Sequence, residues 1–133
     1  PYLNFDGRCR EAFIFYQQVL GGTIATMQTH GESPMAAQTP PEWHDRILHA
    51  RLVVGDQELM GSDSPPHQHA TPQGFAVSLN VDSGAEAERV FAALAAGGSV
   101  QMPLQATFWA GRFGLLTDQF GVPWMVNCEQ PAV

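Results

Sequence analysis

The sequence has 133 residues, is 44% hydrophobic and carries a formal net charge of −7 at pH 7. This length is enough to bury a core, either as one compact unit or as two small modules that share one. With six Lys and Arg in total, all of them arginine, the chain lacks the basic face that nucleic acid and anionic membranes require, so neither is expected as a partner. The acidic balance suits cationic or neutral small ligands, or it simply keeps the protein soluble.

No apolar run approaches the length of a membrane span, and the chain begins directly in strand-like sequence. A cytoplasmic protein is therefore expected. Cys9 and Cys128 are the two cysteines, and their wide separation predicts neither a disulfide framework nor a zinc knuckle. Cys9 falls on the apolar stripe of an expected helix, where packing is the expected role and a reactive thiol is the alternative.

The first predicted elements are a strand over residues 3–5, a helix, and a second strand over residues 23–29. Asp6 stands where it would cap the helix. The helix is indicated by an apolar stripe with the spacing of one buried face, formed by Cys9, Ala12, Phe13, Tyr16 and Leu20. Gly21 and Gly22 end it, since glycine enters the left-handed position after a helix without steric cost.

A long loop is predicted over residues 30–43. Four residues in it would interrupt any regular element, namely Gly31, Pro34, Pro40 and Pro41. Loops of this length in compact domains are often lids or binding segments. Trp43 and His44 at its end either close over a cleft or pack at a helix cap or a dimer contact.

Two strands joined by a tight turn are predicted next, over residues 46–54 and 57–61. Residues 64–73 are rich in proline and histidine, which indicates a linker. The chain is therefore predicted to contain a first module over residues 1–63 and a second over residues 74–133, held together as a single compact domain.

Residues 79–100 repeat residues 3–24 in step and without a gap. Six of the 22 aligned positions are identical, and in the first copy these are Leu3, Asn4, Asp6, Phe15, Gly21 and Gly22. They fall at positions where a strand, a turn, a helix and a second turn each restrict which residue can be present. In the second copy Ser83 and Glu86 also have the spacing of a capping box. We infer a duplicated module.

After the repeat, residues 101–106 are predicted to be irregular around Pro103, and a second hairpin is predicted over residues 112–117 and 123–127. The order is then strand, helix, strand, strand, strand, twice over. It predicts an α+β fold in which two tandem βαβββ modules form a curved mixed sheet around a shared cleft, with the helices outside.

Two signatures stand near the ends of the chain. The opening one consists of PYLNFDG, EA, FY and LGG, and the closing one of MPL, FW, RFG and DQFGVPW. With the element order, they resemble the PhnB-like family of the vicinal oxygen chelate superfamily. That superfamily includes glyoxalase I, bleomycin-resistance proteins, fosfomycin-resistance enzymes and extradiol dioxygenases. The resemblance covers essentially the whole chain.

The resemblance implies a divalent metal held by His, Gln or Glu from four strands, with open positions for adjacent substrate oxygens. It places the usual histidines near Pro1 and Ala76, and the usual glutamates near Met60 or Gly61 and near Met125. None of these residues is a ligand for a hard metal, so we expect the inherited site to be empty. A registration shifted by one or two residues would bring in Asn4, Ser78, Asp63 or Asn127, a set that contains no histidine.

The first hairpin and the linker supply candidates for a replacement site. His49 lies in a strand-like run, where a buried imidazole needs a partner or a ligand. It is either a core histidine bonded to a neighbour or a cleft residue, and it is the weak candidate for a metal ligand. Glu58 and Asp63 flank the next strand and are placed in the cleft by strand alternation, or they are exposed hairpin charges. His67 and His69 have a metal-compatible spacing without a third ligand.

Phe108, Trp109 and Arg112 form the other candidate cluster. An aromatic wall beside one guanidinium can hold a planar or anionic small molecule. The alternative is that Trp109 packs against Phe113 while Arg112 pairs with a surface carboxylate. Trp124 is expected in the core.

Three functions remain open. One is a metal-dependent enzyme of the glyoxalase kind, with His49 as an irregular ligand. Another is a metal-free protein that, like the bleomycin-resistance proteins, sequesters a cationic aromatic molecule in a groove lined by Trp43, Phe108 and Trp109. The last is a degenerate cleft with a structural or regulatory role.

The sequence says less about the cofactor and the partners than about the fold. A divalent metal stays open as a cofactor. The chain has no glycine-rich phosphate or dinucleotide motif, so no nucleotide cofactor is expected. The expected partners are a small-molecule ligand or substrate and a second copy of the chain in a homodimer.

Overall fold

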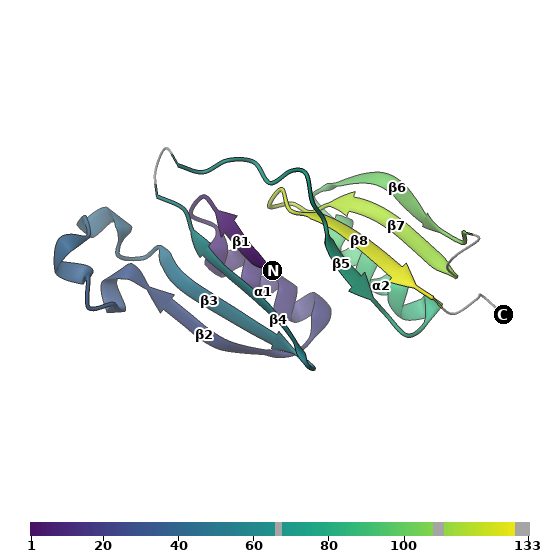
Figure 1. Cartoon of the computed structure of the whole chain (residues 1–133), viewed down its shortest axis with the longest axis horizontal. Helices are drawn as coiled ribbons and strands as arrows, with labels where there is room; N and C mark the ends of the chain where they lie inside the picture. The colour runs from purple at the N-terminus through teal and green to yellow at the C-terminus, as the bar shows by residue number, and fades with distance from the viewer. Residues whose placement is uncertain (66–67, 108–110, 130–133) are drawn as a thin grey trace. The chain divides into compact units, whose positions relative to one another are not determined.

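The computed structural model describes residues 1–65, 68–107 and 111–129. The chain divides into two units, Pro1–Ala70 and Thr71–Val133, and the division falls within the segment predicted to be a linker. We call them unit 1 and unit 2. Each unit combines a four-stranded mixed sheet with an α-helix that covers one face of it (Figure 1). The predicted α+β fold of two βαβββ modules is confirmed.

Unit 1 follows the predicted order of elements. These are β1 (Tyr2–Phe5), α1 (Cys9–Leu20), β2 (Thr23–Thr29), β3 (Ile47–Val54) and β4 (Gln57–Asp63). The sheet order is β1-β4-β3-β2, with β1 parallel to β4 and the other neighbours antiparallel. The predicted long loop holds three short 3₁₀ helices, η1 (His30–Glu32), η2 (Ala36–Gln38) and η3 (Pro41–Trp43).

Unit 2 repeats this topology. Its elements are β5 (Val77–Asn80), α2 (Gly84–Ala95), β6 (Ser99–Gln105), β7 (Arg112–Thr117) and β8 (Pro123–Cys128), and its sheet order is β5-β8-β7-β6. The prediction of an irregular segment over residues 101–106 is wrong, because Pro103 lies within β6. An edge strand tolerates proline, since one side of the strand needs no ladder hydrogen bond. The pairing with β7 is irregular between Met102 and Gln105, on either side of this proline.

A phenylalanine from the helix packs over a glycine of the sheet in both units. A Cβ atom added to Gly61 would lie 2.8 Å from the Phe13 ring, and one added to Gly114 would lie 2.7 Å from the Phe91 ring. Both rings are therefore in contact with the backbone of a strand. The glycines mark which face of each sheet is covered by its helix. Both helices have 12 residues, and no helix in the described part of the chain is long and apolar enough to cross a membrane.

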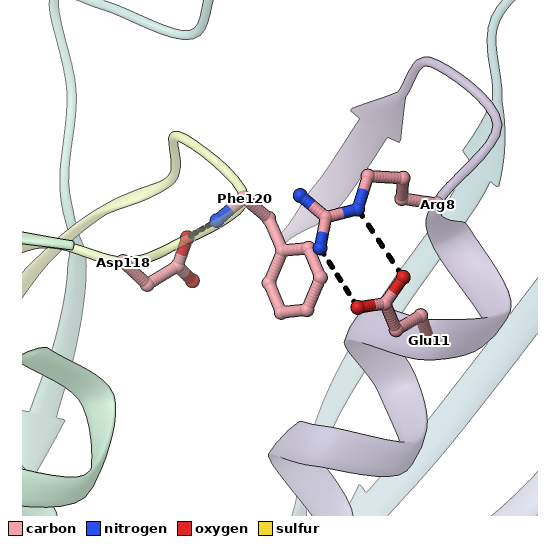
Figure 2. Close-up of polar contacts among 4 residues, drawn as sticks. All are labelled: Arg8, Glu11, Asp118 and Phe120. Atoms are coloured by element: carbon pink, nitrogen blue, oxygen red, sulfur yellow. Dashed lines mark hydrogen bonds and ion pairs between the residues drawn. The ribbon is translucent and has the colours of Figure 1, made fainter. Parts of the chain in front are cut away.

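The start of α1 differs from the prediction. Asp6 does not cap the helix: the N-cap residue is Arg8, whose side chain makes no cap bond and instead pairs with Glu11 (Figure 2). The buried carboxylate of Asp63 takes the capping role, because its Oδ1 accepts a hydrogen bond from the Cys9 N–H at 3.0 Å. This partner lies 54 residues away in the sequence, so no local pattern could reveal it.

The start of α2 follows the prediction in part. The N-cap is Ser83, whose hydroxyl accepts a hydrogen bond from the Glu86 N–H at 3.1 Å. The Glu86 carboxylate pairs with Arg89 one turn along the helix. The serine half of the predicted capping box is thus confirmed.

A second buried carboxylate, that of Asp118, closes the turn between β7 and β8. Its Oδ1 accepts hydrogen bonds from the backbone N–H groups of Phe120 at 2.9 Å (Figure 2) and Val122 at 3.0 Å. Its Oδ2 accepts one from the Trp124 indole at 2.8 Å. Trp124 is only 1% exposed, which confirms the prediction that it belongs to the core.

Candidate functional site

The candidate site of unit 1 is the sheet face opposite α1, which we call the distal face of unit 1. Strand alternation defines it, because Leu3 and Phe5 of β1 are buried against the helix side while Tyr2 and Asn4 are exposed. The distal face carries Tyr2, Asn4, Gln28, His49, Arg51, Glu58, Met60 and Ser62. The register of the strands sets Tyr2 beside Met60 and Asn4 beside Ser62.

His49 reaches this face through a β-bulge in β3. Gln28 of β2 opposes His49 and Thr29 opposes Ile47, so Leu48 is an extra residue. The bulge lets Ile47 remain buried while His49, two positions along, is half-buried and lies on the distal face. The imidazole is thus beside the strands that carry Tyr2 and Ser62 rather than in the core.

Tyr2 and His49 form an aromatic pair on the distal face. Their ring centroids are 5.9 Å apart and the ring planes are inclined by 21°. The Tyr2 hydroxyl lies 3.4 Å from the His49 Nδ1, within hydrogen-bonding reach. Tyr2 is 48% exposed, so the pair offers an accessible aromatic surface.

Glu58 and Asp63 lie on opposite faces of β4, because they are five positions apart and side chains alternate along a strand. Glu58 is exposed on the distal face and pairs with Arg51. The hydrogen bond from Arg51 lowers the pKa of Glu58 below its usual value. Asp63 is 5% exposed and its Oδ2 accepts a hydrogen bond from the Ile47 N–H at 2.8 Å. Asp63 is therefore neither an exposed hairpin charge nor a distal-face residue.

The cluster predicted around Arg112 is described only in part, since Phe108 and Trp109 lie outside the described residues. Arg112 is half-buried, its Nε lies 3.6 Å from a Glu88 oxygen, and its Nη1 donates to the Gly111 carbonyl at 2.8 Å. Its guanidinium also lies beside Gly84 at the start of α2. This placement agrees with the alternative in which Arg112 pairs with a surface carboxylate.

Three further histidines considered in the sequence lie in the linker and the long loop. His67 is outside the described residues, while the His69 Nδ1 is buried and has no hydrogen-bond partner among residues 1–65, 68–107 and 111–129. His44 holds the loop together, with its Nε2 at 3.0 Å from the Ala36 carbonyl and 3.1 Å from that of Thr39.

Trp43 is also engaged within its own loop. Its ring meets the His30 ring edge-on at 5.8 Å between centroids, and the Arg46 guanidinium lies over it at 4.9 Å. A cation over an indole face is a favourable contact. The loop is therefore held by its own side chains.

Unit 2 also has a distal face, on the side of its sheet opposite α2. It carries Ser78, Asn80, Met102, Phe113, Leu115, Met125 and Asn127. The register places Asn127 beside both Asn80 and Phe113, and Ser78 beside Met125. The Asn127 Nδ2 donates a hydrogen bond to the Asn80 Oδ1 at 3.0 Å, and the Asn127 Oδ1 is buried with no partner in the described part of the chain.

The strand positions that bind metal in the vicinal oxygen chelate superfamily carry few groups that could act as metal ligands in this chain. Met60 and Met125 lie on the distal faces, whereas Gly61 faces Phe13 of α1. Met60 lies beside Tyr2 and Arg51, and Met125 lies beside Ser78 and Leu115. Divalent metals in proteins rely on imidazole, thiolate or carboxylate groups, and on these faces such groups are His49 and Glu58, the second of which is paired with Arg51. In the part of the chain that the structure describes, no three His, Cys, Asp or Glu side chains gather as a metal site requires. This donor set does not fit a divalent metal.

The sequence model of the Glyoxalase/Bleomycin resistance protein/Dioxygenase superfamily matches residues 2–126. The chain belongs to this superfamily. Protein YjdN of Escherichia coli K12 is 39% identical over 141 residues, which covers 98% of this chain and 96% of YjdN.

Solved structures support the same assignment. Protein PA1353 from Pseudomonas aeruginosa is 60% identical with a TM-score of 0.91, and the match covers 98% of this chain and 96% of PA1353. The PhnB protein from Bacillus cereus is 26% identical with a TM-score of 0.81, over 96% of this chain and 95% of PhnB. The predicted membership of the superfamily, with its PhnB-like resemblance, is confirmed.

Two features of the distal faces were not predicted from the sequence. Tyr2 entered only as part of the opening signature, and its partner His49 is 47 residues away. Asn80 entered only as one of the repeated identities, and its partner Asn127 is also 47 residues away. The period of two along β1 and β5 could have shown that both residues leave the core side, but the pairings depend on which strands become neighbours.

Proposed function

We propose that this member of the superfamily binds a planar small molecule on the distal face of unit 1 without using a metal ion. The observation that carries the proposal is the stacked Tyr2–His49 pair, in which the Tyr2 ring is 48% exposed. Asn4 and Ser62 lie on the same face and can supply hydrogen bonds. The superfamily's usual metal positions fall near Pro1, Met60, Ala76 and Met125, which carry no imidazole or carboxylate, and this supports binding by stacking and hydrogen bonding instead.

The preferred ligand in this proposal is cationic. The net charge of −7 attracts cations and repels anions over distances of about 10 Å at moderate salt. The one arginine of the distal face, Arg51, is offset by Glu58. A cation over an aromatic face gains about 0.5–2 kcal/mol, depending on how far it is desolvated.

The test compares two probes of the same shape, the cation N-methylquinolinium and neutral quinoline, by NMR titration of the protein at pH 7.5. We expect the cation to bind more tightly. Tyr2→Leu should weaken its binding by about tenfold, which corresponds to about 1.4 kcal/mol. Phe75→Leu is the matched control, because Phe75 is an equally exposed aromatic residue, at 47%, just before β5 of unit 2.

The proposal fails if the two probes bind equally, or if Tyr2→Leu binds the cation as the unchanged protein does. His49→Leu provides a second variant, since it removes the other ring of the pair. Loss of binding in Phe75→Leu but not in the two unit 1 variants would place the ligand elsewhere.

The metal-dependent enzyme is the second candidate, and the placement of His49 on the distal face favours it. The metal content of protein purified without a histidine tag tests it, together with thermal unfolding in added zinc, nickel or manganese and in chelator. A ligand at a hundredfold its dissociation constant stabilises a protein by about 2.7 kcal/mol. Stoichiometric metal and a stabilisation that is lost in His49→Ala would replace the metal-free proposal.

A homodimer remains part of the proposal. Both sheets end in edge strands, β1 and β2 in unit 1 and β5 and β6 in unit 2, and edge strands are common places for chains to associate. Sedimentation velocity at micromolar concentration should give the mass of two chains. A stable monomer would remove this element of the proposal.

A further inference from the structure

The side chains of Asn80 and Asn127, on the distal face of unit 2, share one hydrogen bond where two amides could share two. The Asn127 Nδ2 donates to the Asn80 Oδ1 at 3.0 Å, a normal hydrogen-bond length. Two amides placed side by side can exchange two such bonds, one in each direction. Here the reverse bond is missing, since the Asn127 Oδ1 has no hydrogen-bond partner among the residues that the structure describes.

The unpaired oxygen is costly for the folded protein. The oxygen is buried, and a buried acceptor without a hydrogen bond loses its contacts with water and gains nothing in return. Most buried polar groups in folded proteins have a partner, so an exception needs an explanation. A ligand that donates a hydrogen bond to this oxygen would remove the cost on binding.

The surroundings restrict the chemistry of such a ligand. The distal face of unit 2 carries no charged side chain among the described residues, and beside the asparagines it has Ser78 and the apolar residues Phe113, Leu115 and Met125. A charged ligand would lose its hydration there without gaining a counter-charge. A neutral molecule with an apolar body and an N–H group fits better.

We propose that Asn80 and Asn127 form an anchor for a neutral amide or lactam on the distal face of unit 2. The ligand N–H donates to the Asn127 Oδ1, and the ligand carbonyl accepts from the Asn80 Nδ2. Its apolar body lies over Phe113 and Met125. Asn80 and Ser78 are exposed, so the ligand enters from β5, and its binding requires the Asn127 side chain to shift so that the buried oxygen is uncovered.

The experiment uses oxindole, an aromatic lactam, and N-methyloxindole, in which a methyl group replaces the N–H hydrogen. Binding of each probe to the full chain is measured by NMR titration. We expect N-methyloxindole to bind at least tenfold more weakly. Equal affinities, or no binding of either probe, would overturn the proposal.

Two variants test whether the preference for oxindole over N-methyloxindole comes from the Asn127 Oδ1. Asn127→Leu should abolish the preference for oxindole, whereas Asn127→Asp retains an acceptor at the same place and should keep it. Gln18→Leu, on the exposed side of α1, is the matched loss of an amide and should bind like the unchanged chain. A preference that survives in Asn127→Leu overturns the assignment. If that variant fails to give a folded spectrum, the aspartate variant and the probe pair still decide.

This inference does not depend on the proposed function of unit 1. Binding of N-methylquinolinium, which has no N–H donor, should be the same in Asn127→Leu and in the unchanged chain. Loss of the lactam preference with intact cation binding therefore reports on unit 2 alone.

Discussion

The sheet faces that pack against the helices are built alike in the two units, whereas the opposite faces carry different chemistry. In unit 1 the Phe13 ring packs over Gly61, and in unit 2 the Phe91 ring packs over Gly114. On the distal side, unit 1 presents the titratable and charged residues His49, Arg51 and Glu58. Unit 2 presents amides and apolar side chains instead.

This difference shows where a duplicated βαβββ module is free to change. A helix-facing residue touches many neighbours at close packing, so a change of volume there costs stability. A distal-face residue that is partly exposed meets fewer such limits. The strand alternation of the fold thus separates the residues that maintain the module from those that can recognise a ligand.

The largest effects should come from the two buried carboxylates, which the units use in different ways. Asp118 accepts three hydrogen bonds around one turn, and Asp63 accepts two that join the start of α1 to the start of β3. Truncation leaves these donors unpaired. We expect Asp118→Ala to lower the free energy of unfolding by about 4 kcal/mol and Asp63→Ala by about 3 kcal/mol.

Urea unfolding followed by circular dichroism measures both losses. Asp56→Ala is the control, because Asp56 is exposed in the turn between β3 and β4 and its loss should stay within about 0.5 kcal/mol. Losses in the buried variants no larger than in this control would show that water replaces the carboxylates without cost.

The next effect tests whether the second glycine of each Gly-Gly pair has the same role in both units. An added Cβ atom on Gly22 would collide with the Val53 carbonyl oxygen, and one on Gly98 with that of Thr117. Gly22 also has a φ of 87°, which favours glycine. We expect Gly22→Ala to cost about 3 kcal/mol and Gly98→Ala about 2 kcal/mol.

Gly55→Ala separates strain from collision in this series. Gly55 has a positive φ of 61° but nothing within 4 Å of an added Cβ, so its loss should be only about 1 kcal/mol. Thermal unfolding of the three variants provides the comparison. If Gly98→Ala leaves the stability unchanged, then unit 2 does not need the start of β6 to lie so close to β7, and the two units do not share this requirement.

The sequence predicted the elements well because their signals are local. The apolar stripes of α1 and α2, the two hairpins and the repeated glycines each depend on residues a few positions apart. The continuation of β6 past Val100 was missed because Pro103 is usually a breaker, and only the sheet order shows that this strand occupies an edge.

The site was less predictable because its contacts join distant segments. The carboxylate of Asp63 caps a helix 54 residues earlier, so the nearer Asp6 was chosen wrongly. The bulge at Leu48 decides which way His49 points, and no single strand pattern contains it. The Asn80–Asn127 pair likewise requires the knowledge that β5 runs beside β8.

The smallest predicted effect concerns an ion pair on the distal face of unit 1 that has no counterpart among the described residues of the unit 2 face. The Arg51 hydrogen bond lowers the pKa of Glu58 from its usual 4.5. A lowered pKa in the folded state means that the carboxylate contributes stability above its unfolded-state pKa and loses it as pH falls through the folded-state value. Both side chains are exposed, and exposed pairs contribute little.

Thermal unfolding of Glu58→Gln against the unchanged chain, from pH 7 down to pH 3, isolates this contribution. We expect the variant to melt slightly lower at pH 7 and the difference to vanish in acid, where Glu58 is protonated. Glu129→Gln removes an exposed acid of unit 2 and should show no such convergence. A difference between Glu58→Gln and the unchanged chain that persists at pH 3 would mean that Glu58 acts through packing of its side chain rather than through its charge. The chemical contrast between the two distal faces would then rest on His49 and the asparagine pair alone.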